Sequence, residues 1–309
     1  MSAMNLIPEL PEAPPEFTSV EADAAAELIR LALAEDLGDA GDRTGEALIE
    51  QDAVGRIEIR SRDDGIVCGL PVVTQIFETL DTRVTLTLHV RDGQRIEEPG
   101  CLATLAGPVR SLLAGERTAL NFLGYLSGIA TQVAAHVAAV AGTDARVLDT
   151  RKTLPGWRRL AKYAVACGGG TNHRMGLFDG VLIKDNHLAS RGDQLAVAEA
   201  VTAARDAVPA GLTVQVEVDT LEQLADALRG APDMVLLDNM TPDQLARAVA
   251  IRDEQSPGVL LEASGGITLE SLAEIAATGV DRISLGALTH SVPNWDVSFD
   301  WVAGPDNRP

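Results

Sequence analysis

The chain has 309 residues, enough for one large or two medium-sized domains with a well-buried core. It carries 45 acidic and 25 basic residues, and this net charge of −20 argues against nucleic acid or an anionic membrane as a partner. Apolar residues make up 46% of the chain and aromatic residues only 3%. This composition favours helices packed on buried parallel strands over an all-β sandwich.

The N-terminus and the cysteines indicate the cellular compartment. The first residues have neither the basic region nor the apolar segment of a signal peptide, so we expect a cytoplasmic protein. The three cysteines, Cys68, Cys101 and Cys167, are odd in number and far apart. They therefore predict buried thiols, and neither a disulfide framework nor a zinc site.

Residues 1–16 are rich in Pro and Glu and predict a loosely held arm. A helix is expected from Ser19, as its cap, to Gly38. Alternating apolar residues then predict strands at 56–60 and 84–90, on either side of a helix at 71–80, with one more strand at 101–105. Residues 17–115 therefore predict a small α+β domain with an antiparallel sheet.

Helical periodicity follows from residue 109 to 141, with an expected break at Ser127-Gly128. Strand and helix patterns then alternate, which indicates a parallel α/β sheet closing into a barrel. Helices are expected at 220–228, 242–252 and 269–277. The candidate strands are 145–148, 180–183, 212–218, 233–237, 258–261 and 281–285.

The chain is organised around residues 149–187, where two predicted strands end in charged side chains. Residues 117–184 contain nine bases and three acids, a local charge of about +6 in an acidic protein. Such an island suggests a site for a small polyanion. Arg151, Lys152 and Arg174 would converge there on Lys184, because polar residues at the carboxyl ends of parallel strands build the site in these folds. His173 lies in the same island and could donate to a carboxylate.

Not every base in this region is assigned to the site. Lys184 follows a buried strand, and its alternative role is a plain ion pair with Asp185 or Glu217. Arg158, Arg159 and Lys162 fall at helical spacing and predict a solvated helix face.

Acidic residues and glycines complete the candidate site. Glu217 and Asp238 end adjacent predicted strands and could hold Mg²⁺ through water when a diphosphate is present; the alternative is an ion pair to Lys152 or Lys184. Ser264-Gly265-Gly266 lies between a strand and a helix, where backbone N–H groups can bind a phosphate. Gly286, after the last strand, is the expected second part of that phosphate site.

Seven separate motifs occur in order along the chain: GERTALNF at Gly115, DTRKT at Asp149, CGGGTNHRMGL at Cys167, VLIKDNH at Val181, VEVD at Val216, LDNM at Leu237 and EASGGI at Glu262. Together they resemble the quinolinate phosphoribosyltransferase family, also called carboxylating nicotinate-nucleotide pyrophosphorylases, and the match runs from about residue 25 to 295. The segment Gly41-Asp42-Arg43-Thr44-Gly45 departs from the family pattern, but it lies outside the candidate site.

The resemblance implies an N-terminal α+β sandwich-like domain (17–115), an open α/β barrel of about seven parallel strands (116–290) and a C-terminal tail (291–309) that packs back on the N-terminal domain. It implies transfer of a phosphoribosyl group from 5-phosphoribosyl-1-diphosphate to quinolinate with Mg²⁺, giving nicotinate mononucleotide, diphosphate and CO₂ in NAD biosynthesis. It also implies a homodimer with shared active sites.

By motif, the resemblance assigns the quinolinate carboxylates to Arg151, His173, Arg174 and Lys184, with Arg117 supplied by the partner subunit. It assigns the diphosphate to Lys152, with Glu217 and Asp238 acting through Mg²⁺. The catalytic set is thus Lys152, Lys184, Glu217 and Asp238. The resemblance assigns binding of the 5-phosphate to Ser264, Gly265, Gly286 and His290.

Three other functions remain open from the sequence. A phosphoribosyltransferase for nicotinate or another pyridine carboxylate would need fewer bases and would release no CO₂. A lyase using Lys184 as a Schiff base would need a depressed lysine pKa in an apolar pocket. A non-catalytic metabolite-binding regulator would be expected to lack Lys152, Glu217 or Asp238, and all three are present.

Overall fold

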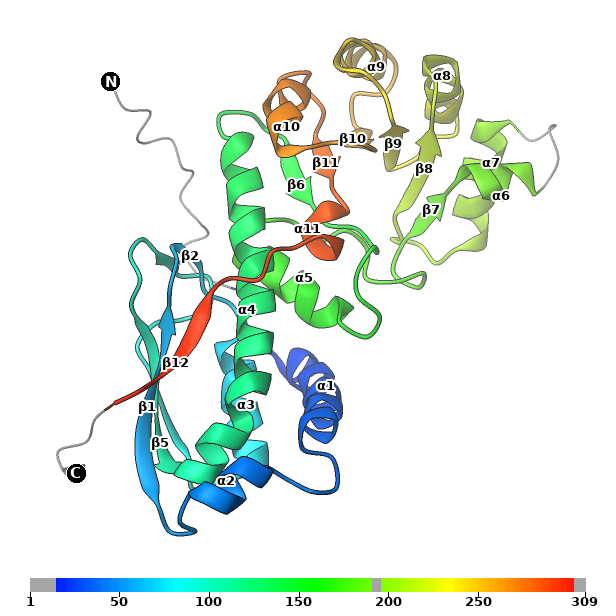
Figure 1. The fold of residues 1–309 in the computed structure, drawn as a ribbon. Coiled ribbons are helices and arrows are strands. Elements are labelled where there is room, and N and C mark those ends of the chain that lie inside the picture. The colour runs from blue at the N-terminus through cyan, green and yellow to red at the C-terminus, as the bar shows by residue number, and fades with distance from the viewer. Residues whose placement is uncertain (1–14, 191–195, 303–309) are drawn as a thin grey trace, which may run out of the picture. The chain divides into compact units, whose positions relative to one another are not determined.

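The computed structural model describes residues 15–190 and 196–302 (Figure 1). Contacts divide these residues into two compact units that interleave along the chain. Of the described residues, we call those in 135–152 and 170–287 the parallel unit, and those in 15–134, 153–169 and 288–302 the antiparallel unit. The domain boundaries at 115 and 290 stay a prediction, and the arm at 1–16 falls almost wholly outside the described residues.

The antiparallel unit is built on a four-stranded sheet of order β12-β1-β5-β3, in which every pair is antiparallel. A small β2-β4 pair accompanies it. Its elements are α1 (Ser19–Leu37), α2 (Arg43–Leu48), β1 (Val54–Ser61), β2 (Gly65–Ile66), α3 (Leu70–Leu80), β3 (Thr85–Leu88), β4 (Arg95–Ile96), β5 (Cys101–Pro108), the first part of α4 (Val109–Ala139), α5 (Arg158–Cys167), most of α11 (Ala287–His290) and β12 (Val297–Trp301).

Helix α1 begins one residue earlier than the sequence indicated. Its N-cap is Thr18, whose side chain accepts from the backbone N–H of Val20, while Glu21 accepts from the backbone N–H of Thr18. This reciprocal pair is a capping box, which Thr18 and Glu21 form because they lie three positions apart. Ser19 is therefore the first helical residue and not the cap.

The expected break at Ser127-Gly128 was wrong, because α4 runs unbroken through both residues. A Cβ atom at Gly128 would lie 2.2 Å from the carbonyl oxygen of Pro293, so this glycine permits a close backbone approach and does not end the helix. The buried Ser127 hydroxyl donates to the carbonyl of Cys68 and accepts from its N–H. Among the described helices α4 alone is long and apolar enough to cross a membrane, and 56% of its most apolar stretch is buried within the protein.

Helix α3 obtains its N-terminal cap from a residue distant in sequence. Its N-cap is Gly69, which has no side chain to offer. The buried carboxylate of Asp92 instead accepts from the backbone N–H groups of Gly69 (2.8 Å) and Leu70 (3.0 Å). The hydroxyl of Tyr163 on α5 donates to the same carboxylate at 3.0 Å. Asp92 thus joins α3 to α5 through one group.

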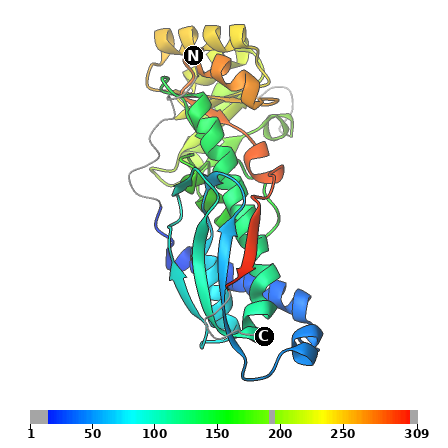
Figure 2. The ribbon, with the colours of Figure 1, turned by 60° about the vertical axis from the view of Figure 1, so that its left-hand side comes forward.

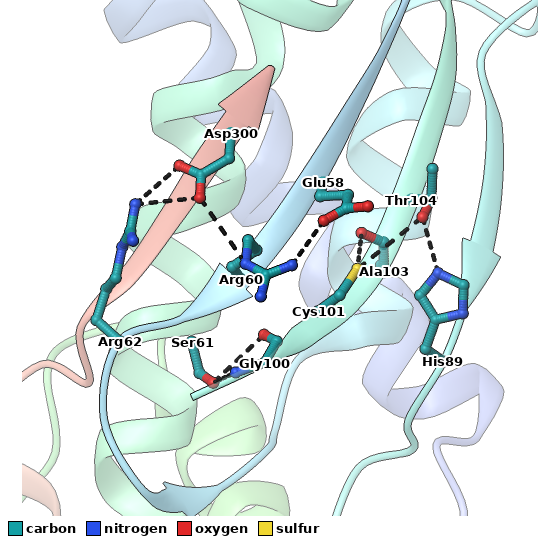
Figure 3. A network of polar contacts seen from close by, with 10 residues as sticks. All are labelled: Glu58, Arg60, Ser61, Arg62, His89, Gly100, Cys101, Ala103, Thr104 and Asp300. Atoms are coloured by element: carbon teal, nitrogen blue, oxygen red, sulfur yellow. Dashed lines mark hydrogen bonds and ion pairs between the residues drawn. The ribbon is translucent and has the colours of Figure 1, made fainter. Parts of the chain in front are cut away.

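The C-terminal strand β12 lies beside β1 at the edge of the antiparallel sheet (Figures 1 and 2). Asp300 on β12 accepts from Arg62 at 2.9 Å and lies 3.9 Å from Nε of Arg60, which also pairs with Glu58 at 2.7 Å (Figure 3). These side chains are between about a quarter and a half exposed, so solvent screens the charges and each pair contributes little to stability. Backbone pairing with β1 therefore holds β12 more than these charges do.

The parallel unit is one six-stranded sheet of order β6-β11-β10-β9-β8-β7, in which all neighbours are parallel. The sheet has six strands where about seven were expected, and Thr171 adds an isolated parallel bridge to Leu148 outside β6. The elements are β6 (Arg146–Leu148), β7 (Val181–Ile183), α6 (Asp185–Ala189), α7 (Val197–Ala207), β8 (Val214–Val218), α8 (Leu221–Arg229), β9 (Met234–Asp238), α9 (Pro242–Gln255), β10 (Leu260–Ser264), α10 (Leu269–Ala276) and β11 (Arg282–Ser284).

All six strands predicted for this part of the chain are present, and the helices expected after β8, β9 and β10 follow them. The largest shift is in β10, which runs to Ser264, three residues past the expected end. The apolar run there stops at Leu261, but pairing with β9 and β11 continues to Ser264. The α/β class with a parallel sheet is confirmed.

The cap of α3 predicts a pH dependence. Burial raises the pKa of Asp92 to about 6, although the N–H groups of Gly69 and Leu70 oppose this. Because the pKa of Asp92 is higher in the folded than in the unfolded protein, protonation of Asp92 stabilises the folded state. This stabilisation is complete below about pH 4 and is lost as the pH rises through about 6. We expect wild type to lose about 3 kcal/mol relative to Asp92→Asn between those values. Urea unfolding across the range measures this, and parallel pH curves for the two proteins would contradict it.

Candidate functional site

The parallel sheet has one apolar and one polar face, because side chains two residues apart along a strand share a face. Val214, Val216 and Val218 on β8 are buried, as are their neighbours on β9, β10 and β11, and α8, α9 and α10 stand along one side of the sheet (Figure 1). The alternate positions are in register across the strands and are mainly polar: Gln215, Glu217, Asp238, Glu262, Ser264, Arg282 and Ser284. The sheet thus presents a polar face opposite its apolar one.

Lys184 and Glu217 meet at the carboxyl ends of β7 and β8. The Lys184 ammonium lies 2.5 Å from Glu217 Oε2, and the side chains are 45% and 12% exposed respectively. The ion pair between Lys184 and Glu217, the alternative role for Lys184, is therefore formed. It holds Lys184 at the carboxyl end of the sheet and leaves the side chain partly exposed to solvent. Asp185, the other possible partner, begins α6.

Asp238 and Ser264 lie side by side at the ends of β9 and β10. Asp238 accepts from the side-chain amide of Asn239 at 2.6 Å. Gly265 and Gly266 both have positive φ angles, +92° and +60°, and a Cβ at Gly265 would lie 2.3 Å from Asn239 Oδ1. Only glycine fits at position 265, which explains why the tight turn expected for a phosphate loop forms there.

The predicted arginine site is partly formed between β6 and β7. Arg174 Nη1 donates to the carbonyl of Gly180 at 2.8 Å, while its buried Nε has no hydrogen-bond partner among the described residues. Burial, and then the nearby charge of Arg151, lower the pKa of Arg174. The charges of Arg151 and Arg174 thus act on each other, with Asp179 partly offsetting them, and guanidinium groups are suited to a carboxylate or phosphate. Arg151 and Lys152 are exposed.

His173 is joined to a carboxylate that the sequence analysis did not assign to the site. Its Nε2 lies 3.3 Å from Glu262 Oε1, and Glu262 is fully buried on β10. Burial raises the pKa of Glu262, but His173 and Arg282 lower it by more, to about 2, so the group stays ionised. Position 262 could have been found from the sequence, because it lies two residues before Ser264 and therefore on the same face.

Two assigned residues, Arg117 and His290, belong to the antiparallel unit. Arg117 is exposed on α4, and His290 is exposed at the end of α11, with Nδ1 2.7 Å from the hydroxyl of Ser291. Gly286 lies in the parallel unit, directly after β11 and Leu285. Arg117 and His290 thus lie in a different unit from the other assigned residues.

The expected solvated face of α5 was wrong for Lys162, which is only 1% exposed. Arg159 fits the expectation better, since its guanidinium is 37% exposed and lies 3.7 Å from Glu21 on α1. Residues 160–165 are all buried because α5 packs against α1. The spacing of the bases could not show that their face is covered.

Glu217 and Asp238 supply hard oxygen donors of the kind that Mg²⁺ prefers. No third His, Cys, Asp or Glu completes a cluster with either of them within residues 15–190 and 196–302. Within the described residues these two carboxylates do not make a closed metal site from protein ligands alone, so a cation here would need further ligands from elsewhere.

The cluster that does occur joins Cys68, Asp92 and Cys167, all buried, with ligand atoms within 4.8 Å of one another. The spacing of the cysteines in sequence gave no sign of it. Asp92 already accepts three hydrogen bonds there, from Gly69, Leu70 and Tyr163. Cys68 and Cys167 are buried thiols, as predicted, while Cys101 is only partly buried.

Comparison with known proteins places this arrangement in a family. Residues 42–127 and 129–300 match the models for the N-terminal and C-terminal domains of quinolinate phosphoribosyl transferase. The chain is 46% identical to a carboxylating nicotinate-nucleotide pyrophosphorylase of Mycobacterium leprae, over 92% of this chain and 99% of that protein. A decarboxylating quinolinate phosphoribosyltransferase of Nicotiana tabacum is 36% identical, over 88% and 81% respectively.

A solved structure shows the same architecture. The nicotinate-nucleotide pyrophosphorylase from Francisella tularensis superposes with a TM-score of 0.85 and 37% identity, over 94% of this chain and all of that one. Both domain models match in order, and the relatives align over nearly their whole length. The chain therefore belongs to the quinolinate phosphoribosyltransferase family.

Proposed function

We propose that this protein transfers the phosphoribosyl group of 5-phosphoribosyl-1-diphosphate to quinolinate with loss of CO₂, forming nicotinate mononucleotide and diphosphate in NAD biosynthesis. The observation that carries the proposal is the row of polar side chains at the carboxyl end of the parallel sheet, next to Arg151, Arg174 and Lys184. The names of the full-length relatives support the same reaction. Release of diphosphate and CO₂ from the two substrates is the direct assay.

The charges suit these substrates. Quinolinate carries two carboxylates, and Arg174 offers an unpaired Nε beside the charge of Arg151. A nicotinate-specific enzyme would have one carboxylate to bind and would release no CO₂, so this rival explains the cationic side chains less well. Lys184 is ion-paired and 45% exposed, which is unlike the apolar pocket that a Schiff-base lysine needs.

The chemistry requires positioning and charge stabilisation rather than a strong nucleophile. The pyridine nitrogen attacks C1 of the ribose while the bond to diphosphate breaks, and the carboxylate at C2 then leaves as CO₂ and is replaced by a proton. Arg174 and Lys184 would hold the carboxylates so that the ring nitrogen faces C1. Electron density left at C2 lies beside a cationic nitrogen, where nearby cationic side chains stabilise it further.

The diphosphate and the 5-phosphate would bind at separate places on the same sheet. We assign the diphosphate to Lys152, with Mg²⁺ held by Glu217 and Asp238 through water; when bound, the cation would offset the charge of the leaving diphosphate. We assign the 5-phosphate to the turn formed by Ser264 and Gly265, with Gly286 and His290. A small-molecule enzyme of this kind agrees with the expected cytoplasmic location, which stays a prediction.

We further propose a homodimer in which Arg117 enters the partner's site. Arg117 is exposed on α4 and lies about thirty residues before β6, so the end of that strand does not place it. Closed two-fold dimers are the commonest assemblies. In such a dimer each subunit can contribute the same surface residue to the active site of its partner, so both sites are completed in the same way. The bases at the site would then include one from each subunit.

Lys184→Ala should lower kcat/KM at least about 100-fold, because the variant removes a charge at the reacting centre. A suitable control is Arg205→Ala, which removes a similarly exposed ion pair with Asp233 at the opposite end of β9. Steady-state assays and circular dichroism should show a folded, inactive Lys184 variant beside an active control. Near-normal turnover by a folded Lys184→Ala protein would refute the assignment of Lys184 to the site.

Activity should depend on Mg²⁺, because Glu217 and Asp238 face a diphosphate in this assignment. Excess chelator should abolish turnover, and added Mg²⁺ should restore it. Asp238→Asn should raise the Mg²⁺ concentration needed for half-maximal rate by about ten-fold or more. Full activity in excess chelator would show that no divalent cation takes part.

Arg117→Ala and Lys184→Ala proteins, each inactive, should regain about a quarter of wild-type activity when mixed equally and allowed to exchange subunits. Half of the dimers are then mixed, and each mixed dimer has one intact site of two, by the two-fold symmetry. A fluorescent label on one variant reports the exchange independently.

The control mixture combines Arg151→Ala with Lys184→Ala, since both residues belong to the parallel unit. Its mixed dimers contain no intact site, so the mixture should stay inactive. Complete exchange in the Arg117 mixture without recovery of activity would show that Arg117 acts within its own subunit.

A further inference from the structure

Glu262 is the most completely buried carboxylate on the polar face of the sheet. Its side chain is fully buried on β10, and two groups donate to Oε2: Arg282 Nε at 3.0 Å and Gln215 Nε2 at 3.2 Å. Oε1 accepts no hydrogen bond of good geometry from the described residues, and the imidazole Nε2 of His173 lies 3.3 Å from it. One oxygen is therefore bound to the sheet and the other faces His173.

The contacts of the imidazole fix which nitrogen carries its proton. The backbone N–H of Arg174 can only donate, and it lies 2.7 Å from Nδ1 of His173. Nδ1 is therefore an acceptor, and the ring proton lies on Nε2, toward the Glu262 carboxylate. The backbone N–H of His173 itself donates to Asp149 Oδ1 at 2.6 Å. Three separate groups thus hold this residue.

This arrangement has an effect on Arg174, the residue that follows. His173 accepts from the Arg174 backbone N–H, and Arg174 Nη1 donates to the carbonyl of Gly180. These two bonds leave the buried Nε of Arg174 without a partner among the described residues. The orientation of a potential carboxylate donor therefore depends on the imidazole, which in turn rests on Glu262.

Stability alone gives little reason to bury Glu262. A buried ion pair contributes little net stability, and apolar side chains of similar volume are often as stable, because desolvation offsets the attraction between the charges. A buried carboxylate that orients a histidine is, however, a common way to fix a ring and its proton near a binding site. The contacts of Glu262 match this second use.

We propose that Glu262 is a positioning residue: it holds the His173 imidazole with Nε2–H toward itself and Nδ1 on the Arg174 amide, and so orients Arg174 toward a substrate carboxylate. The claim that Arg174 is oriented toward a substrate carboxylate rests on the proposed function. The claim that Glu262 fixes the orientation of the His173 ring does not, because it concerns the protein without substrate.

Nitrogen-15 NMR of histidine-labelled wild-type protein tests the orientation without any substrate. At a pH where the ring is neutral, the His173 signals should show the proton on Nε2 and none on Nδ1. Glu262→Gln removes the charge that holds the ring, so in part of the molecules the imidazole should turn away from the Arg174 amide and populate the Nδ1–H tautomer as well. A proton on Nδ1 in the wild type would overturn the proposal, even if the variant failed to fold.

Steady-state kinetics tests the effect on substrate. Glu262→Gln should raise KM for quinolinate about ten-fold or more and change KM for 5-phosphoribosyl-1-diphosphate less than about two-fold. The double variant Glu262→Gln with His173→Ala should have the quinolinate KM of His173→Ala alone, because Glu262 acts through that ring. Equal rises in both KM values, or fully additive effects, would overturn the proposal.

The matched control is Asp281→Asn. Asp281 also accepts from an arginine, Arg252, at 2.7 Å, but it lies before β11 at the opposite end of the sheet. This variant should lose stability and keep both KM values, which separates loss of a partly buried ion pair from loss of positioning. If wild-type protein formed no nicotinate mononucleotide, the proposed function would fail, while the NMR result would still decide the orientation of His173.

Discussion

The structure depends on one constraint of the parallel sheet: side chains at alternate positions of a strand lie on opposite faces. On β8 this places three valines on the face that meets the helices, and Gln215 and Glu217 on the other. Because neighbouring strands pair in register, Asp238 lies beside Ser264 and Ser264 beside Ser284, and Glu262 lies beside Arg282. Leu236 separates Glu217 from Glu262 in the same register. The polar face therefore collects side chains from four strands.

The polar side chains on this face differ in burial, and their chemistry differs accordingly. Gln215 and Arg282 both donate to the buried carboxylate of Glu262 and help to exclude water from it. Glu217, Asp238 and Ser264 are partly exposed toward the carboxyl ends of the strands. The first three groups satisfy each other, whereas the last three can exchange their partners for a ligand. This is the usual division of labour between residues that support a site and residues that bind.

The antiparallel unit uses a buried carboxylate in a different way. No cation among the described residues pairs with Asp92, which accepts hydrogen bonds from two backbone N–H groups at the start of α3 and from the hydroxyl of Tyr163. Glu262 lies between His173 and Arg282, so its pKa falls, whereas burial raises that of Asp92. The two buried acids therefore have opposite pKa shifts, because only Glu262 has a cation, Arg282, and the ring N–H of His173 beside it.

The sequence by itself determined the α/β class, the six parallel strands and the family, because apolar periodicity and ordered motifs are local properties of the chain. It also indicated Lys184, Glu217, Asp238 and the Ser264-Gly265-Gly266 turn, since strand ends can be read from where apolar runs stop. Only the tertiary structure decided that α4 continues through Gly128, that Lys162 is buried and that Cys68 lies near Asp92 and Cys167. Each of these depends on a segment far away in sequence. The pairing of His173 with Glu262 has the same cause, because 89 positions separate two residues whose side chains meet only when the sheet forms.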